Sequence, residues 1–162
     1  MLRGGKGHGI AVSVKGYAGL LSPTRLIVYS FAMTLITDSE SLQQFCTDLT
    51  DSATFITVDT EFIREKTYWP ELCLIQIGGP NQFAAIDSQA EGIDLTPVFE
   101  LMRNPDILKV FHAARQDFEI FYQLMGELPS PVFDTQVSAM VCGFGESVGY
   151  EALVGSLAGK RI

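Results

Sequence analysis

The order of strand-like and helix-like segments after residue 33 is the feature that most constrains the fold. Three β-rich runs come close together, at 53–62, 72–78 and 82–88, with Gly, Pro and Asn between the second and the third. Runs of β-branched and aromatic residues favour strands, and such turn residues connect neighbouring strands. The pattern predicts an antiparallel three-stranded meander.

The rest of the body alternates between helical and extended segments. Thr96 and Pro97 predict the N-cap and the first position of one helix, because proline is well tolerated there. The other expected elements are a strand at 34–37, a helix at 38–49 and, after the meander, a helix at 96–103, a strand at 106–113, a helix at 114–125, a strand at 131–134, and helices at 135–142 and about 147–158. Strands joined by helical crossovers run parallel to one another. We therefore predict an α/β fold in which the antiparallel meander continues into parallel strands flanked by helices.

Composition divides the chain into two parts. Residues 1–32 hold four Lys or Arg and no acid, are rich in Gly and show no clear period. They are predicted to form a disordered basic extension rather than a targeting signal, and Met33 is an alternative start. Residues 33–162 hold seven basic and nineteen acidic side chains, a net charge of −12, and are predicted to form a single domain.

This charge bears on function, because a strongly acidic body argues against a simple nucleic-acid-binding module and suits a carboxylate cluster that gathers cations. No run of eighteen apolar residues exists, so no membrane span is expected. The three cysteines lie far apart without a CxxC pair, which indicates neither a zinc site nor a disulfide framework. They fit a reducing compartment, so we expect a cytoplasmic protein.

Two acids stand in an otherwise buried strand pattern. Asp59 and Glu61 are two residues apart, so they project from the same face of the strand, roughly 7 Å apart along the backbone. The apolar residues around them predict a central strand with the acids near its end, where a ligand can approach. A solvated edge face is the alternative.

Three other polar residues have both a functional and a structural interpretation. Asp117 falls inside an apolar stripe of the helix at 114–125, made of Ala114, Phe118, Phe121, Tyr122 and Met125, so it is expected to face the sheet. Alternatively it complements the helix dipole in the first turn. Asp134 ends a strand and begins a helix, where an N-cap role is favoured. His112 ends an apolar strand and is more typical of a core or near-site histidine than of a metal ligand.

The segments "VDTEFIREKTYWPELCLIQIG", "VFHAARQDFEIF" and "LPSPVFDTQ", in this order, resemble the N-terminal half of ribonuclease D, a 3′-5′ exoribonuclease of the DEDD superfamily. The resemblance runs from about Met33 to the end and implies a ribonuclease H-like fold. It also implies that Asp59, Glu61 and Asp117 are catalytic residues and ligands of two divalent cations, Mg²⁺ or Mn²⁺. It implies that Phe62 lies near the terminal base of the substrate, and that Gln76 and His112 are weaker candidates for positions around the substrate.

The resemblance further implies that the substrates are single-stranded RNA 3′ ends, with tRNA precursors as the expected natural class and a monomer as the expected state. Two ions suit this chemistry because they stabilise both the attacking and the leaving oxygens of a phosphodiester, and hard cations choose oxygen ligands. A DNA exonuclease of the same fold and a catalytically silent binding fragment are the alternatives.

The third motif of that family, Tyr-x-x-x-Asp, is not found before Ile162, since Tyr150 is followed four positions later by Val154. The fourth metal carboxylate and the family's tyrosine are therefore missing from this chain. We expect the fold to be incomplete at its C-terminal end, and the 162 residues alone to be nearly inactive and marginally stable.

Overall fold

The computed structural model describes residues 33–65 and 68–161, and the predicted basic extension lies outside them. The described elements are β1 (Thr34–Ile36), α1 (Ser39–Ser52), β2 (Phe55–Ile63), β3 (Glu71–Gly78), β4 (Phe83–Asp87), α2 (Thr96–Arg103), β5 (Leu108–Phe111), α3 (Arg115–Met125), β6 (Val132–Asp134), α4 (Thr135–Val141) and α5 (Tyr150–Ala158). Every predicted element is present, with ends that shift by up to three residues.

The strands form one mixed sheet in the order β1-β4-β3-β2-β5-β6. β2, β3 and β4 pair antiparallel, as predicted for the meander. β5 pairs parallel with both β2 and β6, which confirms the predicted parallel continuation, and β1 joins the other edge parallel to β4. The α/β fold class is confirmed.

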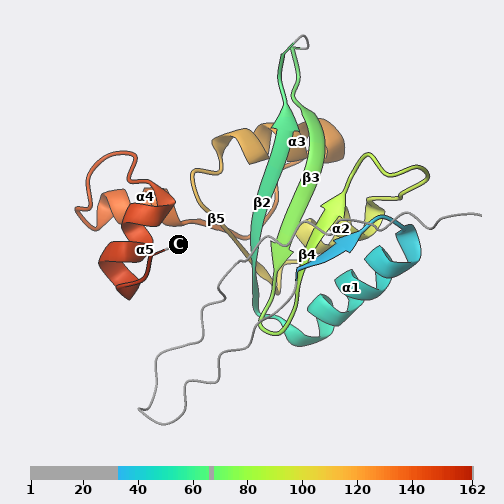
Figure 1. Cartoon of the computed structure of the whole chain (residues 1–162), viewed down its shortest axis with the longest axis horizontal. Helices are drawn as coiled ribbons and strands as arrows, with labels where there is room; N and C mark the ends of the chain where they lie inside the picture. The colour runs from blue at the N-terminus through green and yellow to red at the C-terminus, as the bar shows by residue number, and fades with distance from the viewer. Residues whose placement is uncertain (1–32, 66–67, 162) are drawn as a thin grey trace, which may run out of the picture.

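The core lies on one face of this sheet. Alternate residues of the central strands, such as Ile56 and Val58 of β2 and Ile75 and Ile77 of β3, form one buried cluster with apolar residues of α1, α2 and α3. Figure 1 shows α3 lying behind β2 and β3. The opposite face carries the other set of residues, and Leu35, Phe55 and Phe133 on it are 61%, 48% and 44% exposed. Within the described part of the chain, this face of the sheet therefore leaves large apolar side chains exposed to solvent.

The last two helices contribute little to that core. α4 and α5 lie to one side of the sheet in Figure 1, and their buried residues are Ala139, Leu153 and Val154. Among the described residues, no helix combines the length and the apolar character that crossing a bilayer would require.

Two details of the prediction are wrong. Thr96 is the first residue of α2 rather than its N-cap, which is Leu95, because Asp94 Oδ1 accepts hydrogen bonds from the Thr96 backbone N–H at 2.9 Å and from its hydroxyl at 2.6 Å. Tyr122 was expected in the buried stripe of α3 but is 54% exposed, whereas Ile120 is 1% exposed. Pro70 and Leu72 near the start of β3 line the same hollow as Ile120, so they cover that side of the helix.

One buried group breaks the apolar pattern of the core. Lys109, in the middle of β5, has 0% of its surface exposed, and no acid pairs with it among the described residues. Its Nζ donates instead to the backbone oxygens of Asn104 at 2.5 Å and Ser130 at 2.7 Å. Burial lowers the pKa of the Lys109 amine from 10.5 to about 8. The side chain thereby ties β5 to the loops that follow α2 and α3.

Candidate active site

Asp59 and Glu61 lie on the exposed face of β2, opposite the core. In the register of the sheet Asp59 is beside Gln76 and Glu61 is beside Leu74. β5 pairs with β2 only as far as Thr57, so both acids lie beyond the last residue of β2 that β5 covers. A ligand can approach β2 from that side, as expected for acids near the end of a central strand.

Asp117 reaches the same part of β2 from the other side of the sheet. It occupies the first turn of α3, is only 7% exposed, and its Oδ1 accepts a hydrogen bond of 2.6 Å from the hydroxyl of Thr60. Thr60 is the residue between the two acids and faces the core. The prediction that Asp117 faces the sheet is confirmed, and α3 is fastened to β2 at the position between Asp59 and Glu61.

The pKa values of two of these carboxyls are raised. For Asp59 the main cause is partial desolvation, although the Thr60 backbone N–H and the charge of His112 lower it. For Asp117 desolvation is again the largest cause, the Thr60 hydroxyl opposes it, and the negative charge of Asp59 raises it further. Two ionised carboxylates in this position repel each other, and a bound cation would relieve that repulsion.

The donor chemistry suits a hard divalent cation, since carboxylate oxygens are the ligands that Mg²⁺ and Mn²⁺ prefer. Within residues 33–65 and 68–161, however, no three His, Cys, Asp or Glu side chains are grouped so that they could hold a metal ion. The structure couples Asp59 electrostatically to Asp117 but does not bring Glu61 into a ready-made cluster with them. Convergence of all three acids on metal ions stays a prediction.

The three candidates for substrate contacts lie on or directly after three different strands around the acids. Gln76 is half-buried on the strand next to Asp59, and Phe62 is half-buried just after an irregularity in the β2–β3 register. His112, also half-buried, follows β5, and its ring makes an edge contact with Tyr150 at 5.4 Å between centroids. Their roles as substrate contacts stay predictions.

The hydrogen bonds of His112 define which ring nitrogen carries the proton in its neutral form. The Thr135 hydroxyl lies 2.8 Å from His112 Nδ1 and 3.1 Å from the backbone oxygen of Phe111. A hydroxyl has one hydrogen, and a backbone oxygen can only accept, so Thr135 donates to Phe111 and accepts from Nδ1–H. His112 Nε2 is then left as a hydrogen-bond acceptor.

Asp134 does more than the predicted capping. Its Oδ1 accepts from the backbone N–H groups of Gln136 and Val137 at 2.8 and 3.3 Å, which confirms the N-cap of α4. In addition Oδ1 and Oδ2 accept from the N–H groups of Ala113 and Ala114 at 3.1 and 2.9 Å. Ala113 has a positive φ of 60°, and Ala114 precedes α3. Asp134 therefore anchors the turn from which the Asp117 helix starts, a role for which no sequence pattern gave a signal.

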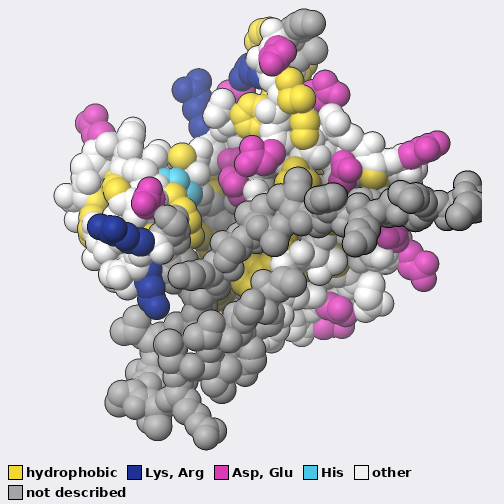
Figure 2. Space-filling view, viewed as in Figure 1, with side chains coloured by type: hydrophobic (Ala, Val, Ile, Leu, Met, Phe, Trp, Pro, Cys, Tyr) yellow, Lys and Arg dark blue, Asp and Glu magenta, His cyan; other side chains and the backbone are white. Residues whose placement is uncertain are grey.

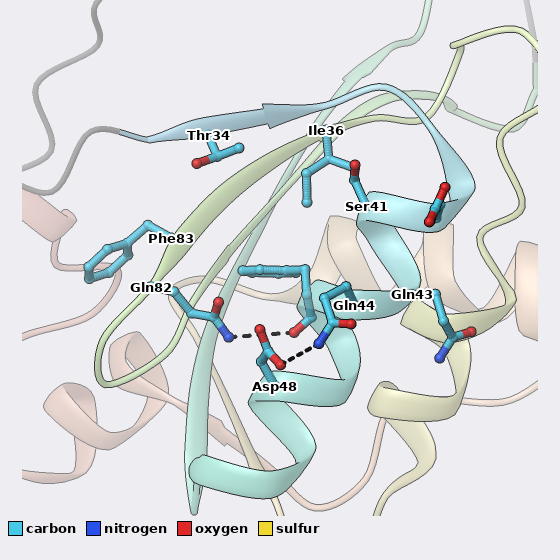
Figure 3. A pocket seen from close by; sticks show the side chains of 10 residues that line it. Thr34, Ile36, Ser41, Gln43, Gln44, Asp48, Gln82 and Phe83 are labelled. Carbon is cyan, nitrogen blue, oxygen red and sulfur yellow. Dashed lines mark hydrogen bonds between the residues drawn. The ribbon is translucent and has the colours of Figure 1, made fainter.

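A separate cavity of about 660 Å³ lies at the far edge of the sheet, between β1, α1 and the start of β4 (Figure 3). It contains hydrogen bonds from Gln82 to the Phe45 backbone oxygen and from Gln44 to Asp48. None of the predicted site residues lines it. The cavity and the acids are therefore different places on the described part of the chain.

The sequence matches the family model of a 3′-5′ exonuclease domain over residues 33–162. It is 59% identical over 128 residues to ribonuclease D of Acidiphilium cryptum, covering 79% of this chain and 32% of that protein. It is 56% identical over 129 residues to ribonuclease D of Granulibacter bethesdensis, covering 80% and 32%. The chain thus spans about a third of the length of the curated relatives it matches.

The fold is similar to those of solved exonucleases. The crystal structure of Escherichia coli RNase D, described as an exoribonuclease involved in structured RNA processing, matches with a TM-score of 0.76 and 35% identity, covering 82% of this chain and 35% of that one. Trypanosoma brucei RNase D in complex with RNA U12 matches with a TM-score of 0.71 and 20% identity, covering 80% and 48%. The second match is a likeness of fold alone.

Proposed function

The chain belongs to the 3′-5′ exonuclease family, and on that premise we propose that it supplies part of the catalytic domain of an exoribonuclease that shortens RNA from its 3′ end. The observation that carries this proposal is the charge interaction between Asp59 and Asp117, two acids near the same part of β2, where the Thr60 hydroxyl holds the Asp117 carboxyl by a hydrogen bond. A buried acid beside a second acid costs stability, so its presence is typical of a functional site.

In the proposed mechanism Asp59, Glu61 and Asp117 hold two divalent cations, Mg²⁺ or Mn²⁺. Such ions, when bound, stabilise the charge that develops on the attacking and leaving oxygens of the phosphodiester. The chain's own contribution is to hold the oxygen ligands in place. β2 presents Asp59 and Glu61 on one face, Thr60 fixes the carboxyl of Asp117, and Asp134 fixes the turn before α3.

Phe62 and Gln76 are proposed to contact the terminal nucleotide, because they adjoin the acids on β2 and β3. His112 Nε2 is available to accept a hydrogen bond from a ribose hydroxyl.

RNA is the proposed substrate class because two relatives more than half identical to this chain are named ribonuclease D. Precursors of tRNA are the proposed natural substrates. The three cysteines are free in the structure, which supports a reducing compartment such as the cytoplasm.

The test compares variants of the protein expressed from its complete coding sequence. Single-stranded RNA labelled at its 5′ end is incubated with Mn²⁺ or Mg²⁺, and a ladder shortening from the 3′ end is expected. Asp59→Ala and Asp117→Ala should each lower the rate at least ~100-fold, since each removes a proposed ligand of the ions. EDTA should abolish trimming.

Asp87→Asn is the matched control, because Asp87 lies in the same cross-strand row as Glu61, two strands away. Its rate should stay within about twofold of the wild type, as expected for a surface substitution. A parallel reaction on DNA of the same sequence tests the sugar preference. Unchanged RNA trimming by Asp59→Ala would refute the proposed function.

A further inference from the structure

The β2–β3 hairpin carries exposed aromatic side chains at its tip. It projects beyond the rest of the sheet in Figure 1, and Ile63, Tyr68 and Trp69 near its tip are 50%, 80% and 45% exposed. The rings of Tyr68 and Trp69 meet edge to face, with centroids 5.2 Å apart. Contiguous exposed apolar patches on soluble proteins often mark surfaces that bind another molecule.

Arg64 joins the described part of the hairpin to α3. Arg64 donates from one guanidinium nitrogen to Glu119 of α3 at 3.0 Å and from the other to the backbone oxygen of Tyr68 at 3.1 Å. It therefore ties both the hairpin and the backbone of Tyr68 to α3. A surface ordered before binding loses less entropy when a ligand arrives.

A second cation lies beside this anchor. Arg115 Nε is 3.9 Å from Glu119 Oε1, and 92% of the Arg115 side chain is exposed. The other Lys and Arg side chains within the described ranges are placed differently: Arg103 pairs with Glu127, Lys109 is buried, and Lys160 and Arg161 follow α5. Exposed aromatic rings and guanidinium groups therefore occur together at the hairpin and the start of α3.

The hairpin is also next to the acids. Ile63 is two residues beyond Glu61 on the same strand, a distance of roughly 7 Å. Figure 2 shows acidic side chains gathered over the middle of β2 and apolar side chains directly above them, over the hairpin, on the same face of the molecule. If the 3′ end of an RNA lies at Asp59 and Glu61, its next nucleotides are within reach of this surface.

We propose that Tyr68 and Trp69, with Arg64 and Arg115, form a binding surface for single-stranded RNA upstream of its 3′ end. Bases stack on the two rings, and the guanidinium group of Arg115 contacts the phosphates. Stacking on aromatic rings tolerates any base and does not need a broad basic face, which fits a chain with a net charge of −8. The proposal depends on the proposed function only for the orientation of the RNA, that is, for its 3′ end lying at the acids.

Trp69 provides a direct measurement because it is the single tryptophan of the chain. A short oligouridylate with a fluorescent label is titrated with the 162-residue chain in EDTA, so that neither catalysis nor metal binding contributes. Label anisotropy reports total binding, and tryptophan emission of the same sample reports contact at Trp69. Quenching that follows the anisotropy curve is expected, with a similar curve for oligodeoxythymidylate.

Variants separate the two kinds of contact. Tyr68→Ala keeps the tryptophan reporter and should weaken binding by roughly fivefold or more, the effect of losing one stacked base. Arg115→Gln should weaken binding and reduce the slope of log affinity against log salt by about 0.7, one phosphate contact to a single strand. Tyr122→Ala, at an exposed tyrosine farther along α3, is the matched control and should bind like the wild type.

Several results would overturn the proposal. These are the absence of RNA binding, binding without quenching of Trp69, equal affinity of Tyr68→Ala and the wild type, or emission that changes with protein concentration alone because two copies pair through the hairpin. If binding behaves as expected while Asp59→Ala leaves trimming intact, the surface stands and the proposed catalytic acids are wrong, so the two proposals fail separately.

Discussion

Replacing Asp134 by Asn tests whether one carboxylate both caps α4 and anchors the turn before α3. Asn is as good an N-cap as Asp, so its oxygen keeps the bonds to the first turn of α4. Its NH₂ group, however, takes the place of Oδ2, which accepts from Ala114 at 2.9 Å, and so faces the Ala114 N–H group. An unsatisfied donor costs about 1–3 kcal/mol, and the half-buried position favours the lower part of that range. Asp134→Asn should therefore lower the free energy of unfolding by about 1–2 kcal/mol.

Asp134→Ala removes the cap of α4 as well, which costs about 1 kcal/mol more. Urea unfolding at pH 7, followed by circular dichroism with an unchanged m-value, measures both variants. Amide exchange at Ala114 should quicken more than exchange in the middle of α3. Asp38→Asn is the matched control, because Asp38 caps only α1, through one bond of 2.8 Å from Ser41 N–H. That variant should stay within about 0.5 kcal/mol of the wild type.

The pH dependence gives an independent check. Desolvation raises the pKa of Asp134, but the N–H groups of Ala114, Val137, Ala113 and Gln136 together hold it below its ordinary value of 3.8. The stability that the carboxylate contributes is therefore present above pH 3.8 and is lost as the pH falls through the folded-state pKa. The advantage of the wild type over Asp134→Asn should shrink in that acid range. Equal stability of the two proteins at pH 7, or a loss as large in Asp38→Asn, would refute the double-anchor interpretation.

Three further variants test the buried polar groups. Folding raises the pKa of Asp117, so the protonated carboxyl contributes stability below pH 3.8, and this contribution is lost as the pH rises through the folded-state pKa. Asp117→Asn should therefore be more stable than the wild type in urea at pH 7 with EDTA. A lower stability of the variant would contradict this. Thr60→Val removes the 2.6 Å hydrogen bond to Asp117 and should lower the free energy of unfolding by about 1.5–3 kcal/mol. Titration of the Asp117 carboxyl by NMR should show a still higher pKa in this variant. An unchanged pKa would argue against the hydrogen bond. Folding lowers the pKa of Lys109 from 10.5 to about 8, so the wild type should gain stability relative to Lys109→Met as the pH rises from 8 to 10.5. The free energies of unfolding of both proteins are measured in urea across this range. If they change in parallel with pH, the amine is not desolvated.

Local patterns predicted the architecture well. The meander and the N-cap at Asp134 depend on neighbours within a few residues, and both are confirmed. The apolar stripe placed Asp117 toward the sheet, also correctly. The side of α3 that the start of β3 covers was not visible in the sequence, so Tyr122 was wrongly included in the stripe.

The contacts that organise the candidate site join residues far apart in the chain. Thr60 and Asp117 are 57 positions apart, and Asp134 is 20 positions from Ala114. The alternation of side chains along a strand implies that Thr60 points away from its acidic neighbours, but it does not identify what Thr60 contacts on the other side. Such pairs depend on how helices dock on the sheet, which is a tertiary property.

The buried amine of Lys109 can serve as a chemical probe of local opening in the sheet. With no surface exposed, it is inaccessible to amine-reactive reagents until β5 separates from the loops after α2 and α3, whereas Lys160, near the end of the chain, is exposed throughout. The rate at which a reagent modifies Lys109 relative to Lys160 therefore measures how often this part of the sheet opens. A covalent footprint read by mass spectrometry can then rank variants by local opening without any denaturant.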